Sequence, residues 1–237
     1  MGRLIRAPLS WIPRHIVLPI VQGPLRGSRW IVGAATHGCW LGVYELPKQR
    51  AFAAEAARSK VIFDVGANVG FYTLLAASIA GTSRVFAFEP LPRNLAYLNQ
   101  HVQLNRLANV QVIAAAVGNA SGIVRFDDSR GPSMGLVTPR GQLEVPAVAL
   151  DELSASGDLP DPDLIKIDVE GSEDDVLAGA ASLLSRARPT IFLATHGDEI
   201  HRRCSDRLQS LGYSLEPLSS DELIARPHAN RSPQFHD

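Results

Sequence analysis

The chain has 237 residues, of which 46% are hydrophobic and 20% are charged, and its formal net charge is −1. This composition predicts one large globular domain and argues against a dedicated nucleic-acid binder, which is usually strongly basic. The two cysteines, Cys39 and Cys204, provide no disulfide framework, so we expect a reducing, cytoplasmic setting.

The first 29 residues carry arginines, and no acidic residue occurs before Glu45. Prolines interrupt the apolar residues of this segment, so we expect neither a membrane span nor a cleaved leader. Its arginines either lie in solvent on a flap or form a basic face toward an anionic acceptor, an RNA or a membrane surface; they are Arg3, Arg6, Arg14, Arg26 and Arg29.

From residue 61 onward, apolar strands alternate with amphipathic helices. The expected strands are 61–65, 84–88, 110–115, 164–168, 191–194 and 213–218, and the expected helices are 71–79, 90–102, 172–184 and 201–211. Ser172 and Asp175 are spaced as a capping box, and Glu173 to Asp175 suit the first turn of the helix that follows. This alternation predicts an α/β fold with a doubly wound, mostly parallel sheet and helices on both faces.

Residues 119–150 break this rhythm. We expect a strand at 123–126, a tip rich in Gly, Ser and Pro at 127–142, and an extended run at 145–150. An insertion of this kind at the rim of a sheet often supplies a substrate lid, so we place it on the acceptor side of the site.

The loop after the first strand reads DVGANVG over residues 64–70. Gly66 and Gly70 permit a tight turn and a close approach of the backbone to a ligand. A dinucleotide fingerprint starting at Gly66 requires glycine where Asn68 and Phe71 stand, which disfavours NAD and FAD. A ligand without phosphates fits better, because the Asp64 carboxylate would repel them.

Two acids at neighbouring strand ends favour a nucleoside that carries a cationic amino group. Asp64 suits the amino group, and Glu89 lies 23 residues beyond Gly66, close to the offset at which an acid binds ribose hydroxyls. S-adenosylmethionine satisfies both conditions.

The chemistry is expected at the tips of the first, fourth and fifth strands. If these strands are neighbours, Asp64, Asp168 and His196 end on contiguous tips. Lys166, Asp168 and Glu170 share one face by the period of two, as an acceptor site or alternatively as an ion-paired strand end. His196 is a candidate general base or acceptor-positioning group, the alternative being a packing role in its loop.

A metal centre is not predicted. His196, His201 and Cys204 have a spacing that invites one, since His-x-x-Cys can place two ligands on one helical face. The sequence supplies no clear complete ligand set, so we assign no metal ligand.

Several motifs in order resemble those of the FkbM family of methyltransferases: DVGANVGFYT at 64–73, FAFEPLPRN at 86–94 and KIDVEGSE at 166–173. GVYE at 42–45 and AAAVGN at 114–119 are also similar, and the resemblance spans about residues 30–227. It implies a class I, Rossmann-like fold with a seven-stranded sheet. It also implies a methyltransferase that uses S-adenosylmethionine and acts mainly on oxygen.

The resemblance also implies roles for particular residues. Asp64, Gly66, Asn68 and Gly70 would hold the methionine moiety, and Glu89 the ribose. Ala116 and Val117 would line the adenine pocket, while Tyr44 and Glu45 would close over the cofactor. Ala67, Phe71, Pro90 and Asp168 are further expected cofactor contacts in the same motifs.

Within one structural domain, we expect residues 1–50 to form an N-terminal segment that serves as a cofactor flap and residues 51–237 to form the catalytic domain. The expected acceptor is a hydroxyl of a sugar, glycolipid, polysaccharide or secondary metabolite. The alternatives are a non-catalytic Rossmann-like binding module and an NAD(P)-dependent oxidoreductase. The sequence names neither the acceptor nor the oligomeric state.

Overall fold

A central seven-stranded sheet organises the chain in the computed structural model, which describes residues 9, 11–79, 81, 83–127, 136–138 and 141–228. The strand order is β12-β13-β11-β10-β3-β4-β5, and every strand is parallel to its neighbours except β13, which is antiparallel to both. The predicted doubly wound, mostly parallel sheet is therefore confirmed. The sheet strands are β3 (Val61–Val65), β4 (Arg84–Phe88), β5 (Val110–Ile113), β10 (Leu164–Ile167), β11 (Thr190–Ala194), β12 (Tyr213–Pro217) and β13 (Glu222–Pro227).

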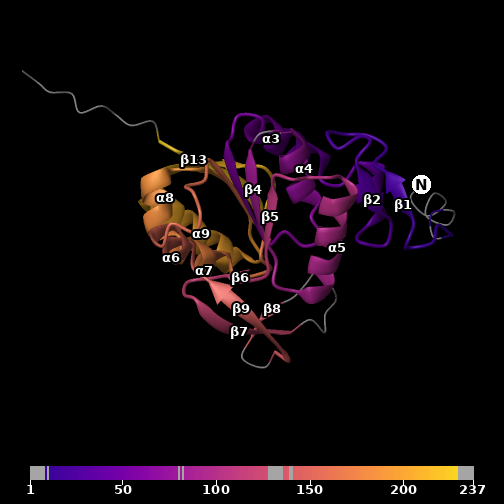
Figure 1. The fold of residues 1–237 in the computed structure, drawn as a ribbon. Coiled ribbons are helices and arrows are strands. Elements are labelled where there is room, and N and C mark those ends of the chain that lie inside the picture. Colours follow the sequence, from indigo (N-terminus) through magenta and orange to yellow (C-terminus); the bar gives the residue numbers. More distant parts are fainter. Residues whose placement is uncertain are drawn as a thin grey trace, which may run out of the picture.

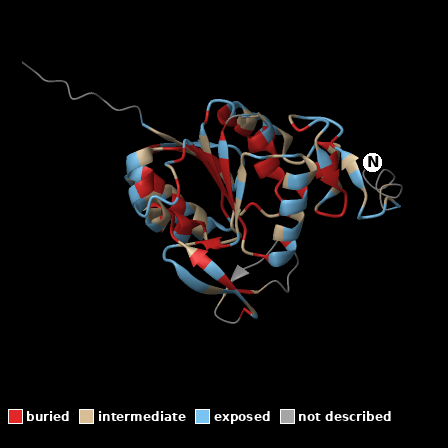
Figure 2. Ribbon diagram, viewed as in Figure 1, coloured by how far each residue is buried: buried red, intermediate tan, exposed pale blue. Residues whose placement is uncertain are grey.

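Helices cover both faces of this sheet (Figure 1). One layer contains α3 (Leu46–Ala56), α4 (Phe71–Ile79) and α5 (Pro92–Leu104), and the other contains α6 (Leu150–Ala155), α7 (Glu173–Ala178), α8 (Ala181–Ala187) and α9 (Asp198–Ser210). Alternate residues of one strand enter different layers: Ile62 packs with α3 and α4, and Phe63 packs with the second layer. The central strands β3, β4, β10 and β11 are consequently buried on both sides, whereas the edge strands β5 and β12 are more exposed (Figure 2).

The segment before α3 forms a small layer beside α4 and α5 (Figure 1). It contains the antiparallel pair β1 (Val17–Pro19) and β2 (Arg29–Ile31), followed by α2 (His37–Leu41). Trp30 is fully buried, stacks on His101 at 4.0 Å between ring centroids, and meets the edge of Phe71 at 5.7 Å. The indole of Trp30 thus anchors the N-terminal segment to the start of α4.

His101 joins three parts of the chain. Its Nε2 accepts a hydrogen bond from the amide of Ile31 at 3.1 Å, which leaves Nδ1 to donate to the carbonyl oxygen of Val69 at 2.7 Å. Burial lowers the pKa of His101 to about 4, so the ring is neutral near pH 7. The predicted ligand loop is held to the N-terminal segment through this imidazole.

The insertion forms a second sheet next to the strand tips. Its strands are β6 (Ala116–Val117), β7 (Gly122–Asp127), β8 (Leu136–Val137) and β9 (Leu143–Val148), in the order β6-β9-β7-β8. The predicted strand at 123–126 is confirmed, while the predicted tip at 127–142 falls largely outside the described residues. Leu150 begins α6 rather than ending an extended run, so that boundary was wrong.

The helix predicted over 172–184 is two helices, α7 and α8, which meet at Gly179. A Cβ on Gly179 would lie 2.1 Å from the carbonyl oxygen of Gly118, so the chain passes too close there for a continuous helix with side chains. Asp151, which lies outside α8, caps the N-terminus of this helix, because its carboxylate accepts hydrogen bonds from the backbone amides of Ser182 and Leu183. Ser172 makes no side-chain cap, so the predicted capping box does not form.

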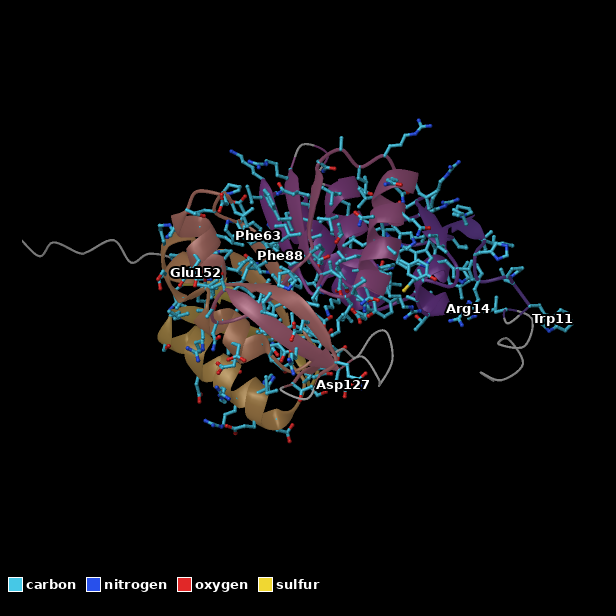
Figure 3. The ribbon with its side chains drawn as sticks, turned by 60° about the horizontal axis from the view of Figure 1, so that its bottom comes forward. Trp11, Arg14, Phe63, Phe88, Asp127 and Glu152 are labelled. Carbon is cyan, nitrogen blue, oxygen red and sulfur yellow. The ribbon has the colours of Figure 1, made fainter. Side chains whose placement is uncertain are left out.

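The structure describes only some of the arginines of the N-terminal segment. Trp11 and Arg14 lie at the outer end of this segment, away from the sheet (Figure 3), and Trp11 is 85% exposed. Arg3 and Arg6 lie outside the described residues. In the part of the chain that the structure describes, every helix is too short or too polar to cross a bilayer.

Candidate active site

A cavity of about 290 Å³ opens at the carboxyl ends of β3, β4 and β10, where the strand order reverses. Most of the residues predicted from the sequence line it: Tyr44, Gly66, Ala67, Asn68, Phe71, Glu89, Pro90, Ala116, Val117, Lys166, Asp168 and Glu170. Glu45, Asp64, Gly70 and His196 do not belong to the lining, and the structure gives each of them another position.

The loop after β3 owes its shape to close contacts with neighbouring protein. A Cβ on Gly66, where φ is +76°, would lie 1.9 Å from the carbonyl oxygen of Asp168. A Cβ on Gly70 would lie 2.6 Å from Leu98 of α5. Both glycines are therefore needed for packing. Their positive φ angles form the tight turn expected from the sequence, and the expected close approach to a ligand stays a prediction.

Glu89 fixes this loop from the neighbouring strand tip. Its Oε2 accepts the amide of Asn68 at 2.8 Å, and its Oε1 accepts the amide of Leu91 at 2.9 Å and the side-chain amide of Asn94 at 3.3 Å. Burial raises the pKa of Glu89 above its ordinary value despite these hydrogen bonds. The carboxylate lines the cavity and can accept further hydrogen bonds from ligand hydroxyl groups, as its expected contact with a ribose requires.

Asp64 is occupied by protein partners. Its side chain is fully buried, accepts the hydroxyl of Thr73 at 2.6 Å, and lies 3.3 Å from the Lys166 ammonium. The expected direct contact with a ligand's amino group therefore has no counterpart in this geometry. Asp64 instead holds Lys166.

Lys166 ties the tips of β3 and β10 together. Its ammonium donates to the carbonyl oxygen of Gly66 at 2.9 Å and lies 3.6 Å from Asp168 Oδ2. Burial works against its charge, but the carboxylates of Asp64 and Asp168 outweigh burial and raise the pKa of Lys166. The ammonium is thus a fixed cation that positions Asp168.

Asp168 and Glu170 bring carboxylates to the cavity mouth. Burial works to raise the pKa of Asp168, but Lys166 and other nearby cations lower it below its usual range, so Asp168 is ionised. Burial raises the pKa of Glu170. The predicted strand face ends early, because β10 stops at Ile167 and Glu170 has φ +57°. A left-handed turn rather than strand periodicity brings Glu170 near Asp168.

His196 lies beside these carboxylates, as expected from neighbouring strands. Its Nδ1 donates to Glu173 Oε1 at 2.7 Å, while Nε2 lies 3.3 Å from Glu170 Oε2 and 3.9 Å from Asp168 Oδ1. The hydrogen bond to Glu173 raises the pKa of His196 to about 9. Both ring nitrogens are therefore protonated near pH 7. In this state His196 has no free nitrogen to act as the expected general base.

Glu173 lies in the first turn of α7, as expected, but its side chain also belongs to the site. It is fully buried, and its Oε1 also accepts the amide of Gly171. Glu173 shares a helix face with Val176 and Leu177 at spacings of three and four, and this pattern could have shown that it points inward.

The N-terminal segment and the insertion both complete the cavity wall. Tyr44 meets the edge of Phe71 at 5.3 Å, and the Tyr72 hydroxyl donates to Glu45 Oε2 at 2.8 Å. The lining residues not expected from the sequence are Ala35, Thr36, Cys39, Val69, Tyr72, Phe88, Leu91, Asn94, Ala115, Phe126, Val169 and Ser172. Most of them lie within the motifs at 64–73, 86–94, 114–119 and 166–173, whereas Ala35, Thr36, Cys39 and Phe126 lie outside these motifs.

The strand order of the sheet, the loop after β3 and the acidic residues at the strand tips together define a Rossmann-like class I methyltransferase. The chain belongs to the family of FkbM methyltransferase domains, whose model matches residues 64–215. The family is S-adenosylmethionine-dependent, and the cavity fits that cofactor, with Glu89 for hydroxyls and Phe71, Leu91 and Ala116 as apolar walls.

Two relatives carry names that state a methyl-transfer activity. The chain is 31% identical over 137 residues to the hexuronic acid methyltransferase AglP of Haloferax volcanii, covering 57% of this chain and 56% of that protein. It is 26% identical over 186 residues to the 2-O-methyltransferase NoeI of Sinorhizobium fredii, covering 70% and 74%. The chain thus spans little more than half the length of AglP.

Solved structures confirm the fold. The FkbM methyltransferase of Methylobacillus flagellatus superposes with a TM-score of 0.53 at 18% identity, over 70% of this chain and 43% of that one. The precorrin-6y C5,15-methyltransferase of Geobacter metallireducens gives 0.50 at 16% identity, over 76% and 89%. At these identities the likeness concerns the fold alone.

Proposed function

We propose that the chain is an S-adenosylmethionine-dependent O-methyltransferase whose acceptor is a hydroxyl group of a sugar, with a hexuronic acid as the first candidate. The observation that carries the proposal is the position of Asp168. Its ionised carboxylate is 25% exposed and lines the same cavity as the Gly66–Asn68 loop. An acceptor hydroxyl entering the cavity therefore meets a hydrogen-bond acceptor near the bound cofactor.

Each part of the chain has a distinct task in this reaction. Glu89 and the loop hold the cofactor, Tyr44 and Phe71 close its pocket, and Lys166 fixes Asp168. When bound, the cofactor supplies an electrophilic methyl group that passes to the acceptor oxygen as the carbon–sulfur bond breaks, leaving S-adenosylhomocysteine. Asp168 orients the acceptor hydroxyl and accepts its proton as the ether forms.

The sugar assignment is supported by the activity that the name of AglP states and by the chemistry of the cavity mouth, and the name of NoeI supports transfer to oxygen. Asp168 and Glu170 accept hydrogen bonds, which suits a ligand with several hydroxyl groups. Family membership favours this activity over an NAD(P)-dependent oxidoreductase. A non-catalytic module is disfavoured by the carboxylates of Asp168 and Glu170, which line the cavity and are partly exposed to an incoming acceptor.

The test is transfer of a labelled methyl group from S-adenosylmethionine to matched sugar acceptors. Oligosaccharides ending in glucuronic acid should yield a labelled methyl ether, and the glucose-terminated analogues test whether the carboxylate is needed. Asp168→Asn serves as the low-activity reference. Absence of label in every sugar, from protein that binds S-adenosylmethionine, would refute a sugar acceptor.

A further inference from the structure

The side chains of Asp168, Glu170 and His196 form a cluster at the cavity mouth that can hold a metal ion. One ligand atom from each lies within 4.8 Å of the other two. Ligands about 2.1 Å from a six-coordinate ion lie about 3 Å apart when adjacent and about 4 Å apart when opposite. The measured separations of 3.3 Å and 3.9 Å from His196 Nε2 fall in this range.

A buried carboxylate orients the histidine toward this cluster. Glu173 accepts the Nδ1 proton of His196, which directs Nε2 toward Asp168 and Glu170. A carboxylate on the far nitrogen is the usual support of a metal-ligating histidine, because it fixes the ring and makes Nε2 a better donor. The ligand Asp168 follows β10, the supporting Glu173 lies in α7, and the ligand His196 lies in the loop after β11.

The charges at this place favour an added cation. Glu173 is fully buried, and its Oε2 has no hydrogen-bond partner among the described residues. Lys166, the ammonium nearest Asp168, also serves Asp64. A divalent ion on Nε2 would displace the proton that this nitrogen carries and would keep a positive charge beside the buried Glu173 carboxylate.

We propose that Asp168, Glu170 and His196 bind a divalent transition-metal ion of the Mn²⁺ class, with Glu173 as the positioning residue for His196. Two carboxylates and one imidazole suit such an ion better than Mg²⁺, which prefers oxygen ligands alone. The three protein ligands leave positions open, and these face the cavity that Asp168 and Glu170 line. Resting on the proposed function, this ion coordinates the acceptor's hydroxyl oxygen next to the methyl donor, while Asp168 binds the ion through Oδ1 and keeps Oδ2, on the Lys166 side, to accept the hydroxyl proton.

This assignment differs from the combination of His196, His201 and Cys204 considered from the sequence. His201 Nδ1 is hydrogen-bonded to the hydroxyl of Thr195 at 2.9 Å, and burial raises the pKa of the Cys204 thiol to about 12. Neither residue belongs to a metal-compatible group among the described residues. The ligands instead come from the KIDVEG motif and the histidine of the neighbouring strand tip.

The test measures Mn²⁺ binding to the metal-free full chain by electron paramagnetic resonance of the unbound ion. Wild type should bind one Mn²⁺ saturably, and Glu170→Gln and His196→Asn should each weaken binding at least tenfold. Glu173→Gln should weaken it as well, although it removes no ligand. Glu199→Gln, which alters an exposed acid paired with Arg202, should bind as wild type does.

Thermal unfolding of each variant verifies that it is folded, and Glu170→Gln, at a partly exposed position, is the variant least dependent on that control. No saturable binding at millimolar Mn²⁺, or equal affinity in all four variants, would overturn the assignment. Calorimetry with S-adenosylmethionine separates the two proposals. Cofactor binding without Mn²⁺ binding refutes the metal site alone, and Mn²⁺ binding without cofactor binding refutes the proposed function alone.

Discussion

The ammonium of Lys166 lies 3.3 Å from the carboxylate of Asp64, and both side chains are buried beneath the loop that begins at Gly66. Registry places them side by side, because Lys166 on β10 pairs with Asp64 on β3. This ion pair connects the strand that carries the cofactor loop to the strand that carries Asp168. It therefore aligns the two halves of the candidate site.

Lys166→Met should destabilise the protein by about 3 kcal/mol, because removing one partner leaves a buried carboxylate uncompensated. Urea unfolding measures this loss. The double variant Asp64→Asn/Lys166→Met should lose less than the sum of the two single variants, since it removes both charges. Strictly additive losses would show that the two side chains are not coupled.

Glu89→Gln should weaken binding of S-adenosylhomocysteine at least tenfold by calorimetry. An amide cannot accept from both the Asn68 and Leu91 amides and also retain an oxygen for a ligand hydroxyl. Glu216→Gln, at an exposed ion pair on β12, is the matched control and should bind normally. Unchanged affinity of Glu89→Gln would remove Glu89 from the cofactor site.

Asp168→Asn should lower turnover by a factor of about 100 while changing S-adenosylmethionine affinity by less than about threefold. The amide keeps the size of the side chain but cannot accept the hydroxyl proton. Steady-state rates and calorimetry on the same preparation separate the two quantities. Near-wild-type turnover would contradict the role given to Asp168.

Stability should fall as the pH drops from about 6.5 to about 4, because His101 stays neutral in the folded protein. Folding lowers the pKa of His101, so between these two pH values the unfolded chain binds a proton that the folded protein does not bind. The neutral His101 therefore contributes its full stabilisation only above about pH 6.5. The shift corresponds to about 3 kcal/mol. Urea unfolding between pH 4 and 7 measures it.

His101→Gln is the variant for this measurement, since an amide can still donate to Val69 and accept from Ile31. It should be less stable than wild type at pH 7, and the difference should shrink toward pH 4. A difference that is constant across this range would contradict the assignment to His101.

The sequence predicted the central sheet because its strands are apolar runs that end in recognisable loops. The tips of β3, β10 and β11 are contiguous as expected, and this brought Asp168 and His196 together. β13 was not predicted as a strand, since Glu222–Pro227 mixes charged and apolar residues and follows the polar residues Ser219, Ser220 and Asp221. Its pairing with β11 and β12 is a tertiary effect.

The site was less predictable where partners come from distant residues. Asp64 has the position of a ligand-binding acid, but Lys166, about a hundred residues later, occupies it. Glu173 is a first-turn acid as predicted, but its hydrogen bond to His196 comes from a residue that is distant in the sequence. Phe126 enters the cavity from the insertion, and no local pattern marks it. Such pairings depend on strand order, which the sequence does not encode locally.

Calorimetric titration of the full chain with S-adenosylmethionine and S-adenosylhomocysteine tests the central claim most directly, with NADH as the comparison. Both adenosyl ligands should bind at one site per chain, and NADH should not bind, because Asn68 and Phe71 stand where a dinucleotide loop requires glycine. Folded protein that binds neither adenosyl ligand, or that binds NADH more tightly than either, would contradict the account.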